Sequence, residues 1–252
     1  MKIVHISDLH LTSPTFVPEW EQNVVNTVNS IQPDILVVTG DLTDWGYEYE
    51  YRVVSGFFEK IKANRLIVVP GNHDSRNEGY LIFEEIFGTR YPYYEDNEVV
   101  ILGIDSSEPD IDDGHIGREN YDIIKDRFWA KDKIKILALH HHLIPIPGTG
   151  RERHIPVDAG DVLRLCTELE INFIFSGHKH QPWIWKLEKS YFATAGTATT
   201  RRLKGRSFPS FNILDISQEK LTLYEVNVAQ KSTKEIKVIL RGEFNEKTTR
   251  GN

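Results

Sequence analysis

Cysteine is almost absent from this chain of 252 residues, in which Cys166 is the single one. One cysteine excludes an intramolecular disulfide and any zinc site built from several thiolates. Cys166 follows Val162-Leu163-Arg164-Leu165, a helix-like stretch in which we expect a buried thiol without a catalytic role. Any metal site in this chain must therefore use oxygen and nitrogen ligands.

Long hydrophobic runs and an excess of positive charge are absent as well. No apolar run approaches the ~20 residues of a membrane-spanning helix. The start, Met1-Lys2-Ile3, enters a predicted strand without the length or cleavage site of a signal peptide, so we expect a cytoplasmic protein without membrane contact. The 30 Lys and Arg against 37 Asp and Glu give a formal charge of −7. This balance provides no general attraction to a nucleic-acid polymer, and none is expected as a partner.

Strand and helix signals alternate through the first half of the chain. Apolar runs predict strands, amphipathic stretches predict helices, and the resulting βαβ units predict parallel strands with right-handed crossovers. From Trp183 onward the pattern changes to short strands without helices. Two sheets packed face to face, with helices outside, accommodate the whole pattern. We therefore predict a single domain over residues 1–242 and a polar C-terminal tail over residues 243–252.

Five segments far apart in the chain carry metal-binding or proton-transferring side chains, and each follows an apolar run. The segments are Asp8-Leu9-His10, Gly40-Asp41, Gly71-Asn72-His73-Asp74, His140-His141-His142 and Gly177-His178-Lys179-His180. Side chains at the carboxyl ends of neighbouring parallel strands converge where open α/β sheets bind ligands. In Asp8-Leu9-His10 the alternation of a strand places both side chains on one side, so both can reach one ion. Carboxylate, amide and imidazole ligands suit Mn, Fe or Zn.

The number of ligands predicts a pair of metals. There are seven candidates: Asp8, His10, Asp41, Asn72, His140, His178 and His180. The two oxygens of Asp41 can bridge two ions, which gives each ion four protein ligands and leaves room for water. That arrangement fits a pair of ions about 3.5–4 Å apart that clamps a phosphate.

In this order the segments resemble the calcineurin-like metallophosphoesterase superfamily, from residue 2 to near residue 200. Gly177-His178-Lys179-His180 looks most like the class III cyclic-nucleotide phosphodiesterase branch. The resemblance implies an α/β fold, a four-layer αββα sandwich of two mixed β-sheets flanked by helices. It also implies two divalent metal ions, one held by Asp8, His10, Asp41 and His180 and the other by Asp41, Asn72, His140 and His178.

The resemblance also implies catalytic residues. His73 matches the family's non-ligand histidine, which contacts the scissile phosphate and can protonate the leaving group, and Asp74 would orient His73 or its loop. The implied chemistry is in-line attack on phosphorus by a metal-activated hydroxide. Many relatives have a proline straight after their paired histidines, whereas Leu143 follows His142 here. We expect His140 to be the ligand because it comes first after its strand, with His141 lining the pocket or contacting a ligand.

Other features leave alternatives open. Arg201, in a basic cluster with Arg202, could reach a substrate phosphate or lie on solvated surface. The stretch Gly148-Thr149-Gly150-Arg151-Glu152-Arg153 is a candidate lid. The acidic stretch 110–114 is not an EF-hand, because Tyr121 stands where the glutamate would be, and a solvated loop is expected. The aromatic residues Trp45, Tyr47, Tyr49 and Tyr51 could stack on a base, but they more often pack between helices or at a subunit contact, which leaves a homodimer open.

The expected function is therefore a dinuclear-metal-dependent phosphodiesterase that acts on small organic phosphoesters. Cyclic nucleotides are the first candidates, by resemblance alone, and glycerophosphodiesters, pyrophosphates and phosphomonoesters are close alternatives. The rival from another class is a non-catalytic, protein-binding scaffold with the same fold. In such a scaffold we expect ligands to be replaced, whereas here all seven positions and His73 are present.

Overall fold

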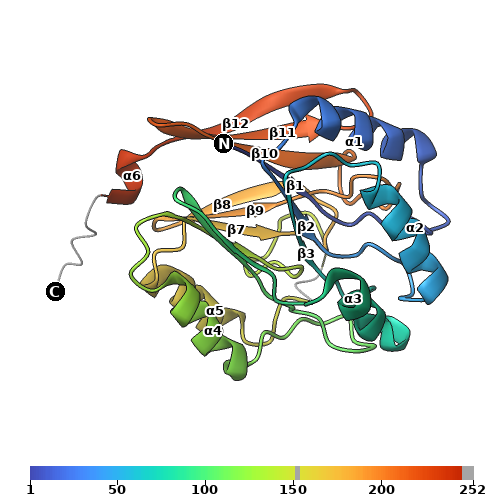
Figure 1. The fold of residues 1–252 in the computed structure, drawn as a ribbon, viewed down its shortest axis with the longest axis horizontal. Helices are drawn as coiled ribbons and strands as arrows, with labels where there is room; N and C mark the ends of the chain where they lie inside the picture. Colours follow the sequence, from blue (N-terminus) through green and yellow to red (C-terminus); the bar gives the residue numbers. More distant parts are fainter. Residues whose placement is uncertain (151–153, 246–252) are drawn as a thin grey trace.

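Two mixed six-stranded sheets form the centre of the fold (Figure 1). The computed structural model describes residues 1–150 and 154–245. The first sheet has the order β12-β11-β10-β1-β2-β3. Its strands are β1 (Lys2–Ile6), β2 (Ile35–Thr39), β3 (Arg65–Val69), β10 (Ser210–Ile216), β11 (Lys220–Asn227) and β12 (Ser232–Leu240). The three N-terminal strands run parallel, as predicted, and β10 pairs antiparallel with β1.

The second sheet has the order β4-β5-β6-β7-β9-β8. Its strands are β4 (Tyr93–Glu95), β5 (Val99–Gly103), β6 (Ile134–Ala138), β7 (Phe173–Ser176), β8 (Trp183–Leu187) and β9 (Ser190–Thr194). The four central strands β5, β6, β7 and β9 are parallel, and the two edge strands are antiparallel to them. Unbroken burial of β2, β5 and β7 explains why their sequences are continuous apolar runs.

Helices cover the outer faces of the two sheets (Figure 1). The helices are α1 (Pro18–Ile31), α2 (Glu48–Phe58), α3 (Gly79–Phe87), α4 (Tyr121–Phe128), α5 (Ala159–Glu168) and α6 (Gly242–Asn245), with short 3₁₀ turns at Arg76–Glu78 and Arg118–Asn120. Side chains of α1, α2 and α3 pack in one core against the first sheet, and those of α4 and α5 pack against the second. A third core lies between the sheets. The predicted four-layer αββα sandwich is confirmed. Among the described residues, no helix is long and apolar enough to cross a membrane.

His5 shows how the two sheets are joined near the site. Its ring, on β1, stacks on Phe175 of β7 with centroids 4.5 Å apart and an angle of 5° between the planes. Nε2 lies 2.9 Å from the hydroxyl of Thr39. Burial lowers the pKa of His5 to about 3, so the ring is neutral at physiological pH. His5 is thus a packing residue between the two sheets.

Part of the predicted tail is structured. Residues 243–245 belong to α6, where the centroid of the Phe244 ring lies 6.2 Å from that of Phe173 and 6.3 Å from that of Tyr191. Residues 246–252 of the predicted tail lie outside the described residues, as do residues 151–153 of the predicted lid. The division into one domain and a tail stays a prediction.

Cys166 of α5 is buried, as expected, and we predict that it is inert in the folded protein. Burial raises the pKa of its thiol to about 12, so the reactive thiolate is scarce at pH 8. A thiol reagent such as DTNB should react with the native protein at least about tenfold more slowly than with the protein unfolded in guanidinium. Rapid stoichiometric release of thionitrobenzoate from native protein would contradict this prediction.

Candidate dinuclear metal centre

The five predicted segments meet in the loops after β1, β2, β3, β6 and β7, so both sheets contribute to one site. Backbone hydrogen bonds join these loops directly. The Asp8 N–H donates to Gly40 O at 3.0 Å, and the His10 N–H donates to Asp41 O at 2.9 Å. Across the sandwich, the Gly177 N–H donates to His140 O at 2.9 Å. The strand ends therefore fix the relative positions of the functional side chains.

The backbone at the candidate ligands is not that of a strand. Five of them have positive φ: Asp8 (53°), His10 (41°), Asp41 (55°), His178 (74°) and His180 (53°). Asp8 and His10 lie beyond the end of β1, so the prediction that strand alternation aligns them was wrong. A positive φ costs a non-glycine residue about 1–3 kcal/mol and persists only where the surroundings enforce it. The hydrogen bonds between loops supply that enforcement, and such strain is typical of functional sites.

One cluster consists of Asp8, His10, Asp41 and His180. His10 Nδ1 lies 3.1 Å from Thr43 O, and His180 Nδ1 lies 2.6 Å from Arg202 O. A carbonyl only accepts, so each Nδ1 carries a proton, and Nε2 is the atom of each ring that can offer a lone pair to a cation. The Nε2 atoms of His10 and His180 are 3.2 Å apart, and Asp8 Oδ1 lies 3.1 Å from Nε2 of His180. Electron pairs that face one another in this way fit a bound cation.

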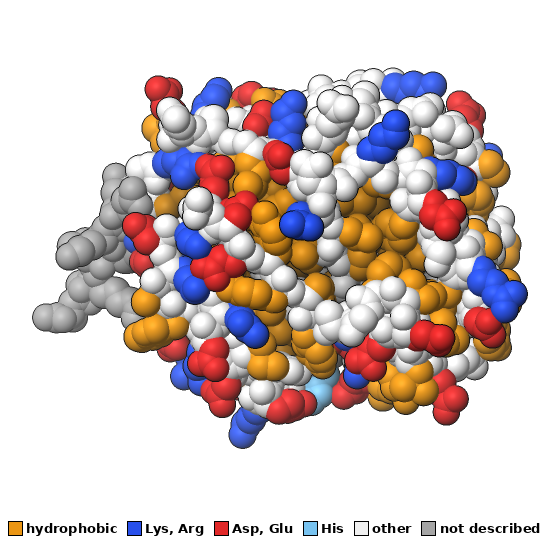
Figure 2. Space-filling model, viewed as in Figure 1, with side chains coloured by type: hydrophobic (Ala, Val, Ile, Leu, Met, Phe, Trp, Pro, Cys, Tyr) orange, Lys and Arg blue, Asp and Glu red, His pale blue; other side chains and the backbone are white. Residues whose placement is uncertain are grey.

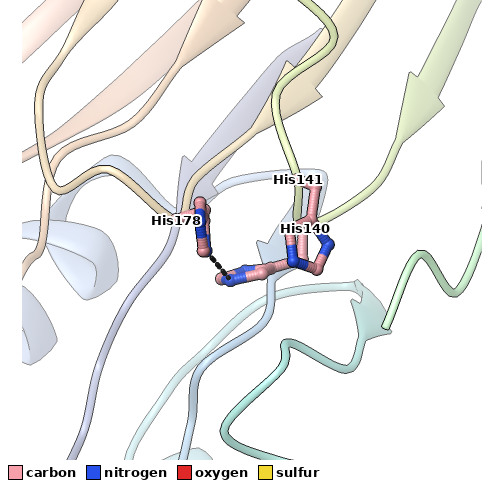
Figure 3. A group of neighbouring side chains, drawn as sticks. All are labelled: His140, His141 and His178. Carbon is pink, nitrogen blue, oxygen red and sulfur yellow. Dashed lines mark hydrogen bonds between the residues drawn. The ribbon is translucent and has the colours of Figure 1, made fainter. Parts of the chain in front are cut away.

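The second cluster contains Asn72, His140 and His178. His140 Nδ1 donates to Thr39 O at 2.7 Å, which directs Nε2 toward Asn72 Oδ1 at 3.1 Å and His178 Nδ1 at 3.2 Å. Figure 3 shows the rings of His140 and His178 close together, with their planes at 84° to one another. Asp41 Oδ2 lies 3.4 Å from His140 Nε2 and 3.5 Å from His10 Nε2. Asp41 thus lies between the two clusters, where a bridging ligand belongs.

Burial and charge set the protonation of these rings. Burial lowers the pKa of His10 to about 4 and that of His178 well below its usual value, so both are neutral. Burial also opposes charge on His140, but the neighbouring Asp41 carboxylate outweighs it and raises the pKa of His140 to about 9. The site therefore attracts positive charge even at a buried ring. A metal ion at His140 would take the place of that proton.

His141 is directed to a loop, although it lies close to His140 and His178. Its Nδ1 lies 2.9 Å from the hydroxyl of Ser106, and its Nε2 lies 3.2 Å from Asp112 O. A Cβ on Gly114 would come within 2.6 Å of the ring, so glycine is required for this packing. Both nitrogens of His141 therefore have partners from residues 106–112, whereas Nε2 of His140 faces the other candidate ligands.

Asp74 holds loops in place and has no hydrogen bond to the His73 ring among the described residues. Its carboxylate accepts from the N–H groups of Leu42, Thr43 and Gly71 at 2.9–3.1 Å. Burial raises the pKa of Asp74 to about 6. Of the two roles considered for Asp74, the geometry agrees with orientation of the loop.

Asp44, which sequence reasoning missed, contacts the ring of His73, as does Arg76, whose Nη1 lies 3.1 Å from His73 Nδ1. His73 Nδ1 donates to Asp44 O at 2.7 Å and lies 3.6 Å from its carboxylate. The same carboxylate lies 3.3 Å from His10 Nδ1 and 2.9 Å from the Arg202 guanidinium. His10, Asp44 and His73 also lie close enough to hold an ion, but the Nδ1 atoms of both rings are occupied by carbonyl oxygens. The sequence signal that could have identified Asp44 as a site residue is its position three residues after Asp41.

A cavity of about 580 Å³ opens over the clusters. It is lined by Asp41, Asn72, His73, Asp112, Thr149, His154, His178, Lys179, His180, Arg202, Leu203 and Lys204. Arg201 is exposed and absent from this lining, so of the two neighbouring arginines it is Arg202 that reaches the cavity. Thr149, from the predicted lid, does line the cavity.

The acidic loop over residues 110–114, which the sequence predicts to be solvated, also contacts residues of the site. Asp112 Oδ1 accepts from Asn72 Nδ2 at 3.0 Å and from the Arg76 guanidinium at 2.6 Å, and so fixes the amide whose oxygen faces His140. Asp113 Oδ1 lies 2.6 Å from Nδ1 of His154. This loop therefore forms part of the rim of the cavity.

The aromatic group after Asp41 does not line the cavity. Trp45, Tyr47 and Tyr49 are exposed, and Tyr51 is fully buried, with its hydroxyl donating to Asp74 O at 2.9 Å. The interpretation of these rings as a stacking face for a base has no support in the geometry. Tyr51 packs beneath the site, as aromatic residues between helices do.

A four-layer sandwich with paired Asp and His clusters at its strand ends defines a metal-dependent phosphoester hydrolase. A family model described as calcineurin-like phosphoesterase matches residues 1–182. The chain therefore belongs to the calcineurin-like phosphoesterase family, and the predicted resemblance is confirmed.

Individual relatives are similar over most or part of the chain. A probable cyclic nucleotide phosphodiesterase of Xenorhabdus bovienii is 25% identical over 87% of this chain and 97% of its own length. A probable glycerophosphodiester phosphodiesterase GpdQ of Arcobacter nitrofigilis is 27% identical over 56% of this chain and 57% of its own. Purple acid phosphatase from yellow lupin has the same fold, with a TM-score of 0.77 at 13% identity, over all of this chain and 57% of its own.

Proposed function

We propose that this chain is a phosphodiesterase that hydrolyses small organic phosphodiesters with two divalent metal ions, residues 1–242 forming one catalytic domain. The observation that carries this proposal is the pair of donor clusters joined by Asp41. In them, nitrogen and oxygen atoms face one another at 3.1–3.5 Å.

The donor set fits the metals. Asp8, His10, Asp41 and His180 would hold one ion, and Asp41, Asn72, His140 and His178 would hold the other. Oxygen and nitrogen ligands without thiolate suit Mn, Fe or Zn. When bound, two such ions supply Lewis-acid stabilisation of charge on a phosphate and an activated water.

The chain's own residues would position the ester and handle the proton. Lys179, Arg202 and Lys204 line the cavity and give its wall positive charge, which attracts a phosphate anion. His73 Nδ1–H is held by Asp44 O, so Nε2 is the atom left to carry a proton for the leaving oxygen. The Asp44 carboxylate lies 3.6 Å from the same Nδ1.

The cavity also bears on the identity of the ester. At about 580 Å³ it lies within the roughly 300–1,000 Å³ of small-molecule sites. Among the described residues that line it there is no Phe, Tyr or Trp, and its only aromatic rings are those of histidines, of which all but His154 already have a proposed role as ligand or proton donor. Recognition would depend on the phosphate and on hydroxyl groups. Glycerophosphodiesters are therefore candidates of equal standing with cyclic nucleotides, and both appear in the names of relatives.

A substrate panel tests the proposal. Purified protein with added Mn should hydrolyse bis-p-nitrophenyl phosphate with a higher kcat/KM than p-nitrophenyl phosphate, and should hydrolyse cyclic AMP, glycerophosphocholine or both. A preference for the monoester would point to a phosphomonoesterase on the same site. Protein that binds no metal and shows no Mn-stimulated turnover of any compound would favour the scaffold.

A further inference from the structure

A second cavity, of about 240 Å³, lies between the two sheets at the edge where β8 faces β11 and β12. Among the described residues, the two cavities have no lining residue in common. Ile184 of β8, Leu223 of β11 and Ile236 of β12 form apolar walls. Hydrophobic side chains are exposed across the middle of the face drawn in Figure 2, at the height where Figure 1 places β8 and β9.

Two polar side chains in this cavity already have partners. Asn212 Nδ2 donates to Thr194 O at 3.3 Å and lies 3.4 Å from Nδ1 of His5. The hydroxyl of Thr194 lies 3.2 Å from that of Ser176. Both side chains are thus held by the fold, and neither brings a charge into the cavity.

Glu225 of β11, unlike Asn212 and Thr194, brings a charge into this cavity. It is the one charged residue among the described residues that line the cavity, and it is only partly exposed. Within the described part of the chain, its carboxylate has no hydrogen bond and no ion pair. Lys234, its cross-strand neighbour, is exposed and acts only at longer range. Burial raises the pKa of Glu225, which reflects the cost of holding an unpaired carboxylate against apolar walls.

We propose that this cavity binds a small organic ammonium ion, with its hydrocarbon part against Ile184, Leu223 and Ile236 and its charged nitrogen on the Glu225 carboxylate. A cation there removes the cost of the unpaired charge, and the apolar walls favour a hydrocarbon chain over a hydrated metal ion. An anion is excluded by repulsion from Glu225. The volume is below the roughly 300–1,000 Å³ of drug-sized sites, so the ligand is an amine of a few carbons.

Calorimetric titration of the full chain with n-pentylammonium chloride at pH 7.5 tests this site directly and requires no catalytic turnover. Saturable binding of one amine per chain is expected. 1-Pentanol has the same shape without the charge. It should bind at least about tenfold more weakly, because it cannot form a hydrogen bond between charged groups. Pentanoate should not bind.

Glu225→Gln should weaken binding of the amine by about tenfold or more. Glu235→Gln, on the exposed part of β12, should leave the affinity for the amine unchanged. Ile236→Phe, which narrows the cavity and keeps the carboxylate, provides a second variant that should also weaken binding. Three results would overturn the proposal: no saturable binding, equal binding by wild type and Glu225→Gln, or equal binding of pentanoate. A dimer in sedimentation velocity that excludes the amine would overturn it too, by assigning the cavity to a second copy of the chain.

Discussion

Asp41→Asn is expected to lower phosphodiester turnover by roughly 1,000-fold, equivalent to about 4 kcal/mol of transition-state stabilisation, even with saturating Mn. The wild-type carboxylate has one oxygen within 3.5 Å of Nε2 of both His10 and His140. Its other oxygen accepts the backbone N–H of His73 at 2.9 Å. An amide keeps the shape of this side chain, but it has a single oxygen and no charge. Both proposed metal positions are therefore weakened by one substitution.

The protonation of the site explains why the effect should be large. Burial works against a charged Asp41, but His140 and His73 hold the pKa of its carboxyl well below its usual range. Asp41 in turn raises the pKa of His140 to about 9, against the effect of burial. In Asp41→Asn the pKa of His140 should fall. The carboxylate is thus the main negative charge that draws cations to both clusters.

Metal content by inductively coupled plasma mass spectrometry and steady-state turnover of bis-p-nitrophenyl phosphate check this prediction together. Bound Mn should fall from two ions per chain to one or fewer, with an unchanged circular dichroism spectrum. Asp122→Asn on α4, which removes an exposed carboxylate, is the matched control and should behave as wild type. Near-normal turnover with two ions retained in Asp41→Asn would refute the bridging role.

The positions of several strands could be predicted because these buried parallel strands consist largely of continuous apolar runs, such as residues 35–38 of β2 and 173–175 of β7. The candidate ligands could be predicted for a related reason. Asp8 and Asp41 directly follow the paired parallel strands β1 and β2, so they had to be neighbours, whereas His178 follows β7 of the other sheet and meets them through the packing of the two sheets. Strand direction and ligand position are therefore local properties that a sequence records.

The conformation of the loops could not be read in the same way. Asp8 and His10 meet because both have positive φ, enforced by hydrogen bonds to Gly40 and Asp41. Nothing within the segment Asp8-Leu9-His10 encodes those partners. Asp112 and Arg202 reach the site through loops whose paths depend on long-range packing. Residues brought in by loops need three-dimensional contacts for their identification.

His73→Ala is expected to lower turnover of an alkyl phosphodiester by about 100- to 10,000-fold, the usual contribution of a general acid, while both metal ions stay bound. His73 lines the cavity, and its Nδ1–H is fixed on Asp44 O at 2.7 Å, which leaves Nε2 for the substrate. Its ring meets His10 edge-on, with centroids 4.7 Å apart. Since the side chain is absent from the two proposed ligand sets, its removal should not empty them.

The choice of leaving group separates proton donation from simple contact. An alkoxide such as that of glycerol needs a proton as it departs, whereas p-nitrophenolate is stable without one. The loss in His73→Ala should therefore be much larger for glycerophosphocholine than for bis-p-nitrophenyl phosphate. His115→Ala, which removes a surface histidine paired with Glu108, is the matched control and should leave both rates unchanged. Equal losses for the two substrates would reduce His73 to a phosphate-contacting residue, and full activity with both would remove it from the reaction altogether.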